Sequence, residues 1–152
     1  MIALTIVTAL GSALVAGVFL GFSTFIMPAL ARLPAPQGIA AMQSINVTAV
    51  RPPFMVFFIG TALLSIATIV VGVADSDAYL IAGGALYLIG SFGLTIAYNV
   101  PRNDALAAVD PGSPAGAQVW ERYLHEWVAA NHVRTLAGLA AAALMVVAIH
   151  VH

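Results

Sequence analysis

The chain has 152 residues, of which 62 % are hydrophobic and only 7 % are charged. Soluble domains carry about a quarter charged residues, so this composition excludes a water-soluble globular protein and indicates one embedded in a membrane. The length fits one domain, residues 1–152. A net charge of −1 offers no basic surface for nucleic acid. Without cysteine, disulfides, thiolate nucleophiles and cysteine-ligated metal sites are excluded.

The first apolar run covers residues 2–30, more than the roughly 20 residues that cross a bilayer. A cleaved signal peptide is the alternative, because Ala29-Leu30-Ala31 has the small residues of a cleavage site. The run lacks a basic start and exceeds the apolar core of a signal peptide, so we expect a retained helix, ended by Pro28, Pro34 and Pro36. Small residues every four positions should let another helix, or a second copy of the chain, approach closely: Ala9, Ala13, Gly17 and Gly21.

Three further spans are predicted, at residues 54–74, 79–98 and 132–150. Residues 37–50 have apolar side chains at helical spacing and are predicted to form a short amphipathic helix. The polar turn at 74–77 makes the second and third spans antiparallel neighbours. We expect the segment 99–104 to break the third span, residues 110–116 to form a loop, and a helix from Ala117 to lead into the fourth span.

The predicted fold is an all-α, integral membrane, antiparallel four-helix bundle with helical extensions on one side of the membrane. Four crossings place both termini on the other side, together with Asp75 and Asp77. An excess of basic residues marks the cytoplasmic face, so we expect a plasma (inner) membrane protein with its polar side in the cytoplasm and both termini outside. The polar side receives every basic residue: Arg32, Arg51, Arg102, Arg122 and Arg134.

The densest polar stretch is Trp120 to Thr135, directly before the last apolar run. On a helix, Trp120, Trp127 and Arg134 fall on one stripe because they lie seven positions apart, and Asn131 lies beside them. This stripe suits the interior of the bundle. The alternative is a belt of aromatic residues at the membrane surface, with an arginine whose side chain reaches toward water.

Four asparagines lie at the same side of the membrane, on three different polar segments. Amide groups that converge in an apolar opening could orient a carbonyl or phenol group of a ligand. For Asn99 and Asn103, next to Pro101, a role as turn or cap residues is the ordinary alternative. The candidate amides are those of Asn46, Asn99, Asn103 and Asn131.

A second stripe of the same helix carries Glu121, His125 and His132, which match a metal-binding triad by residue type. Seven residues of helix cover about 10 Å, which is too long for a mononuclear site on one straight helix. A metal site would therefore need ligands from another helix. A bound metal, and with it a metal-dependent membrane enzyme, remains an alternative.

Four segments resemble a family of small four-span membrane proteins whose named members are the anthrone oxygenases of polyketide pathways. In chain order they are GFSTFIMPAL, MQSINVTAVRPPFM, YNVPRNDALA and WERYLHEWVAANHVRT. The resemblance covers nearly the whole chain. It implies oxidation of a lipophilic aromatic compound by O2, as in the conversion of an anthrone to an anthraquinone. The matching positions are Asn46, Asn99, Pro101, Asn103, Trp120, Trp127, Asn131, His132 and Arg134.

On these positions a mechanism can be drawn. His132 would remove a proton from the central CH2 group of an anthrone, and Arg134 with Asn131 and the other asparagines would stabilise the oxyanion. Trp120 and Trp127 would contact the substrate. The resulting carbanion can reduce O2 directly, so this mechanism requires no flavin or haem. The alternative function is a non-enzymatic membrane protein that binds a small molecule or assists assembly, since the sequence contains no complete catalytic motif.

Overall fold

The structure, a computed structural model, describes residues 1–151, so His152 at the end of the predicted domain lies outside it. The described chain is all-α and contains no strand. Three stretches are π-helical and are continuous with the α-helices beside them. In chain order the elements are α1 (Ile2–Gly21), η1 (Phe22–Ile26), α2 (Met27–Ala31), α3 (Ala35–Ala49), α4 (Phe54–Asp75), α5 (Ala78–Ala85), η2 (Leu86–Gly93), η3 (Thr95–Asn99), α6 (Val100–Ala107) and α7 (Pro114–Val151).

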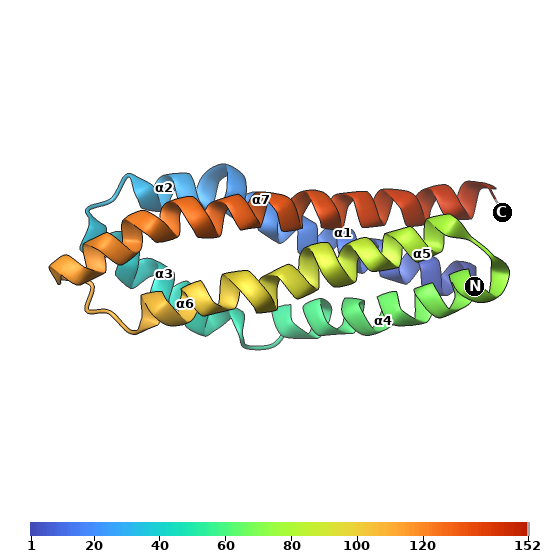
Figure 1. Cartoon of the computed structure of the whole chain (residues 1–152), viewed down its shortest axis with the longest axis horizontal. Coiled ribbons are helices and arrows are strands. Elements are labelled where there is room, and N and C mark those ends of the chain that lie inside the picture. The colour runs from blue at the N-terminus through green and yellow to red at the C-terminus, as the bar shows by residue number, and fades with distance from the viewer. Residues whose placement is uncertain (152) are drawn as a thin grey trace.

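Four long helices lie side by side, and both termini are at the same end of the molecule (Figure 1). The described chain has 4 helices long and apolar enough to cross a membrane. α1 packs against α4 and α7, and α5 packs against the same two helices. The predicted all-α membrane bundle is therefore confirmed. At 22 residues, α4 has about the length of a bilayer core, whereas the other three helices have 30 to 38 residues.

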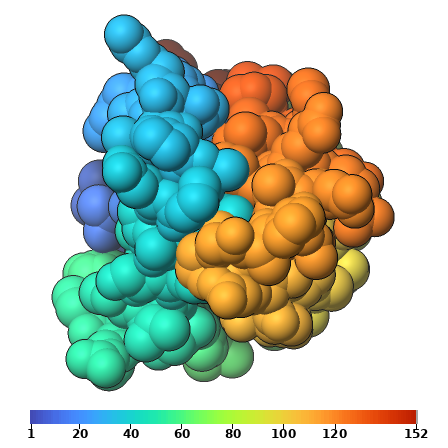
Figure 2. All heavy atoms as spheres, turned by 90° about the vertical axis from the view of Figure 1, so that its left-hand side faces the viewer, coloured from blue at the N-terminus to red at the C-terminus, as the bar shows by residue number. Residues whose placement is uncertain are grey.

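The longer helices extend past the start of α4 and form the predicted extensions at the end opposite the termini. Figure 2 shows this end, where α2 and α3 cover one half and the start of α7 with the preceding loop covers the other. The apolar face of α3 packs under Trp120, as its helical spacing predicts, through Ile39 and Met42. Gln43 ties α3 to α6 by donating hydrogen bonds of 2.9 and 3.1 Å to the carbonyls of Leu106 and Val109.

The predicted break in the third span is wrong. The helix continues through residues 99–104 and ends at Ala107. A proline lacks an N–H donor and clashes with the carbonyl four residues earlier in a regular α-helix. The wider π-helical turns of η3 immediately precede Pro101 and relieve this conflict. η1 precedes Pro28 in the same way, so that proline also lies inside a helix that ends at Ala31.

The last helix begins earlier than predicted and does not bend into separate pieces. α7 is one helix of 38 residues from Pro114 to Val151. Proline is favoured in the first turn, and the hydroxyl of Ser113 accepts a 2.9 Å hydrogen bond from the N–H of Gly116. The loop predicted to last until residue 116 therefore ends at Ser113.

The polar turn between α4 and α5 is confirmed. Ser76 adopts a left-handed conformation with φ 56°, which ends α4. Asp77 begins α5, since its carboxylate accepts hydrogen bonds of 2.8 and 3.1 Å from the N–H groups of Tyr79 and Leu80. This pair of caps turns the chain back on itself at the end where the termini lie.

Small residues do bring α1 and α7 together, but on a stripe different from the predicted one. The hydroxyl of Ser12 donates a 2.8 Å hydrogen bond to the carbonyl of Gly138. A Cβ atom on Gly138 would come within 2.9 Å of the Cβ of Ala16. Ala13 and Gly17, from the predicted stripe, are exposed on the outer surface, whereas Ala9 and Gly21 are buried. Association of two copies through that stripe stays a prediction.

Candidate functional site

The bundle contains a cavity of about 890 Å³, between α1, α3, α4, η3 and α7. This volume is in the range of small-molecule sites. The lining is mostly apolar, and it includes Phe57 and Ile96, which are 47 % and 52 % exposed, so the cavity reaches the lipid-facing surface. Residues from all three π-helical stretches contribute to the lining. Its aromatic side chains are Phe19, Phe22, Phe54, Phe57, Phe58, Phe92 and Trp127.

Arg134 lies at the inner wall of this cavity and is only 4 % exposed. Its guanidinium carbon is 3.9 Å from the ring centre of Phe19 and 4.7 Å from that of Trp127. Nε donates a 2.8 Å hydrogen bond to Oδ1 of Asn131, and Nη1 donates a 3.2 Å hydrogen bond to the hydroxyl of Thr95. Aromatic faces and neutral oxygens therefore hold the charged group in place.

No carboxylate neutralises Arg134 within the described residues. The ion pair of that part of the chain joins Arg102 and Glu126, at 2.9 Å. Arg51 is the second charged residue of the cavity lining, which contains no aspartate, glutamate or histidine. The cavity is thus an apolar space whose charged side chains are both positive. A buried charge without a counter-ion is costly, and such groups in membrane proteins typically mark a functional site.

Asn131 is fully buried, one helical turn from Arg134, and connects it to α1. Its Nδ2 atom donates hydrogen bonds of 2.7 Å to the carbonyl of Phe19 and 2.7 Å to the hydroxyl of Ser23. Every polar atom of the amide is thereby used within the protein. Asn131 orients the guanidinium of Arg134 and does not line the cavity itself.

His132 lies on the outer face of α7 and is exposed. Its Nδ1 atom is 2.8 Å from the hydroxyl of Ser23, which in turn accepts a hydrogen bond from Asn131. The imidazole is absent from the cavity lining. The residue predicted as a base is therefore connected to the site through one serine, without reaching the cavity.

The four asparagines converge only in part. Asn46 and Asn103 line the cavity, whereas Asn99 is buried between helices and donates a 3.2 Å hydrogen bond to the carbonyl of Trp127. Oδ1 of Asn103 accepts a 2.8 Å hydrogen bond from the hydroxyl of Tyr123. Nδ2 of Asn46 and Nε1 of Trp127 are buried and have no hydrogen-bond partner within the described residues. Both residues line the cavity, but these two nitrogen atoms are enclosed by protein, and the side chain of Asn46 lies beside that of Tyr123.

Both tryptophans face the interior, which decides against the membrane-surface belt. Trp120 is 4 % exposed and Trp127 is 3 % exposed. Their rings stack on Tyr123 from either side, with centroids 5.7 and 5.5 Å away. Only Trp127 lines the cavity; Trp120 packs on Gly38, where a Cβ atom would come within 2.9 Å of the indole ring.

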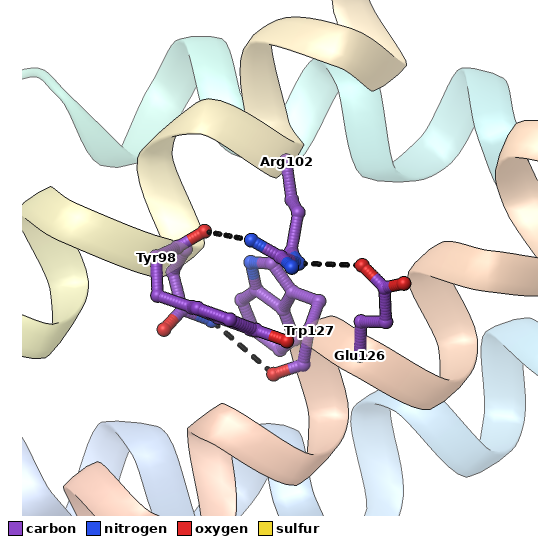
Figure 3. Close-up of polar contacts among 5 residues, drawn as sticks. Tyr98, Arg102, Glu126 and Trp127 are labelled. Carbon is purple, nitrogen blue, oxygen red and sulfur yellow. Dashed lines mark hydrogen bonds and ion pairs between the residues drawn. The ribbon is translucent and has the colours of Figure 1, made fainter.

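A second polar cluster ties η3 and α6 to α7 beside the cavity (Figure 3). The guanidinium of Arg102 lies 3.2 Å from the ring centre of Tyr98 and donates a 2.9 Å hydrogen bond to Glu126. Its Nη1 atom also donates to the carbonyl of Tyr98 at 3.0 Å. This cluster and the bond from Asn99 fix the backbone of Trp127, so they hold one wall of the cavity in place.

The structure does not bring the metal-triad candidates together. Glu121, His125 and His132 are all exposed, at successive levels of α7. Within residues 1–151, no group of three or more histidine, cysteine, aspartate or glutamate side chains is positioned to hold a metal ion.

Several residues of the site were not singled out from the sequence. Phe19, Ser23 and Thr95 contact Arg134 or Asn131 directly, and Phe54 and Phe92 complete the aromatic walls. The hydroxyls of Ser23 and Thr95, inside otherwise apolar segments, are the one local signal that could have indicated them. The phenylalanines carry no such signal, because apolar residues fill every span.

The sequence model of the anthrone oxygenase family matches residues 49–144, which is more than half of the chain. Except for Asn46, every predicted site residue lies within this range, from Asn99 to Arg134. No curated protein and no solved structure matches the chain. With its four long apolar helices and this match, the chain is an integral membrane protein that belongs to the anthrone oxygenase family.

Proposed function

We propose that the protein oxidises a lipophilic, electron-rich aromatic compound with O2, in the manner of an anthrone that becomes an anthraquinone. In this reaction the CH2 group and one O2 molecule give a carbonyl group and one water molecule. The observation that carries the proposal is Arg134, a buried positive charge without a carboxylate partner, at the wall of an aromatic cavity large enough for a polycyclic ring system.

The reaction begins with the ionisation of the substrate. Loss of a proton from the CH2 group places negative charge on the ring carbonyl oxygen, and Arg134 stabilises this oxyanion. Asn46 and Trp127, which line the cavity, contact the rest of the substrate. Since the lining holds no carboxylate or imidazole, the proton leaves to water at the mouth of the cavity, beside the exposed Arg51 on the linker between α3 and α4.

The ionised substrate supplies the electrons. Its carbanion carbon forms a bond to O2, the peroxide takes up a proton, and loss of water leaves the carbonyl group of the quinone. Both O2 and a polycyclic phenol dissolve in the apolar core of a membrane. The lipid-facing opening at Phe57 and Ile96 therefore gives both reactants a path into the cavity. No flavin, haem or metal enters this electron balance.

In this proposal Asn131 and His132 are positioning residues. Asn131 holds Nε of Arg134, and His132 acts through the hydroxyl of Ser23 on the orientation of Asn131. Asn99, Asn103 and Trp120 support the walls through their contacts with α7 and Tyr123, and Trp127 contacts the substrate.

The polar end of the molecule is proposed to face the cytoplasm, with both termini outside. Arg134 lies inside the bundle, so the charge asymmetry rests on the four remaining arginines at that end: Arg32, Arg51, Arg102 and Arg122. The end with the termini carries only Asp75 and Asp77 in its connecting turn. A reporter that is active only in the cytoplasm should be inactive when fused after residue 151, and activity there would reverse the orientation.

The function is tested by oxygen uptake of the purified protein in neutral detergent with emodin anthrone, next to a metal analysis of the same sample. We expect uptake above the spontaneous rate, lost in Arg134→Gln and retained in Arg32→Gln, an exposed arginine outside the cavity lining. Binding of the anthrone without uptake would indicate a binding protein instead of an enzyme. Uptake that tracks a stoichiometric metal would contradict the metal-free electron balance.

A further inference from the structure

We infer that the cavity holds its ligand as an anion: a planar aromatic phenolate or enolate whose charged oxygen lies against Arg134, with Arg51 at the mouth. This inference rests on the proposed function and adds to it the charge state of the bound ligand. It is carried by the placement of the two arginines and by the aromatic walls.

Both charged residues that line the cavity are positive. Its two charged residues are Arg134, which is 4 % exposed at the inner wall, and Arg51, which is exposed on the linker between α3 and α4. The acidic group of the ion pair among the described residues, Glu126, binds Arg102. Because Arg134 is almost fully buried, its attraction to an oxyanion is stronger than that between the same groups in water. A neutral ligand would leave this charge unmatched.

The walls favour a flat ring over a flexible chain. Phe54 and Phe58 stack with centroids 5.7 Å apart, and Phe58 lies 4.9 Å from Phe92. Phe19 packs edge to face against Phe54 and Phe58. The guanidinium of Arg134 lies over the ring of Phe19 in a cation–π contact. A fatty acid also combines an apolar body with an anionic group, but it has no ring that can stack against the phenylalanine rings of the cavity. An aromatic anion uses both the charge and the walls.

The consequence is measurable on the ligand itself. A phenol that binds as its anion has a lower pKa when bound than in the detergent micelle alone, because binding stabilises the charged form. Emodin is a suitable probe, since its visible absorption changes when its phenol ionises. We expect the pKa of bound emodin to be lower by about one unit or more, which is a tenfold preference for the anion.

Substitutions at three arginines separate an effect of charge on the pKa of bound emodin from an effect on folding. Arg134→Lys keeps the positive charge and should keep most of the pKa shift of bound emodin, whereas Arg134→Gln should lose it and still bind the neutral form at low pH. Arg51→Gln, at an exposed position that does not support the bundle, should lose a smaller part. Arg32→Gln, exposed at the same end but outside the lining, should show the wild-type shift.

Two results would overturn the inference: a phenol pKa that is equal in the wild-type protein and in micelles, or a full shift in Arg134→Gln. Displacement of emodin by oleate at an equal or lower concentration would assign the site to lipid anions. Because emodin binding requires neither O2 nor turnover, a pKa shift without oxygen uptake would refute the proposed function alone. Oxygen uptake without the shift would refute the anion alone.

Discussion

Asn131→Asp is the most informative single substitution, because it changes the charge at the site with almost no change in shape. The amide oxygen of Asn131 lies 2.8 Å from Nε of Arg134. An aspartate there would place a permanent negative charge against the guanidinium. At about 4 Å between charge centres and an effective dielectric constant near 20, the attraction is about 4 kcal/mol.

That attraction competes with the substrate oxyanion. We expect kcat/KM for emodin anthrone to fall by at least about 100-fold, since about 1.4 kcal/mol corresponds to a factor of ten in rate. The ion pair with Arg134 favours the folded variant, and the hydroxyl of Ser23 can turn to donate to the carboxylate, whereas the hydrogen bond to the carbonyl of Phe19 is lost. We therefore expect a folded protein with a lower melting temperature. Oxygen uptake is the assay, and melting temperature in detergent verifies the fold.

Two control variants separate the effect of the added negative charge from the effect of the lost hydrogen bonds. Asn131→Ala removes the same hydrogen bonds without adding charge, so its activity should exceed that of Asn131→Asp. Gln118→Glu adds an equal charge at an exposed position of α7 outside the cavity and should leave activity unchanged. If Asn131→Asp were as active as the wild type, or no worse than Asn131→Ala, an uncompensated Arg134 could not be the source of catalysis.

His132, on the outer face of α7, and Gly138, between α1 and α7, allow two further tests. His132→Ala should lower kcat/KM by less than about tenfold, because the imidazole reaches the site only through Ser23; complete loss of uptake would restore it as the base. Gly138→Ala should lower the melting temperature in detergent, since its Cβ would come within 2.9 Å of Ala16, while Gly17→Ala, with no atom within 4 Å, should not. Equal melting temperatures for the two glycine variants would contradict the α1–α7 packing.

Local pattern sufficed for much of the architecture. The apolar runs, the helical spacing of Ile39 and Met42 and the seven-residue spacing of Trp120, Trp127 and Arg134 correctly predicted spans, a short helix and an inward stripe. Each of these follows from the requirement that a helix satisfies its own backbone in lipid and turns one face to its neighbours.

The sequence analysis wrongly predicted that Pro28 and the segment around Pro101 end their helices, because the effect of a proline depends on the backbone around it. Pro28 and Pro101 end a regular helix in isolation, yet each follows a π-helical stretch and lies within a continuous helix. Hydrophobic periodicity does not reveal a single π-helical turn, so the π-helical stretches before these prolines could not be predicted from the sequence.

What the sequence alone determined is therefore a membrane-spanning helical bundle with one polar end, because hydrophobicity and period are properties of neighbouring residues. The tertiary structure alone decided which polar groups meet. Asn131 is 112 positions from Phe19 and Arg134 is 39 positions from Thr95, although each pair is within hydrogen-bond distance. His132 is adjacent to Asn131 in the chain and yet lies outside the cavity, since one step along a helix rotates a side chain by about 100°. The charge of the cavity is decided in the same way, by which helices pack together around Arg134.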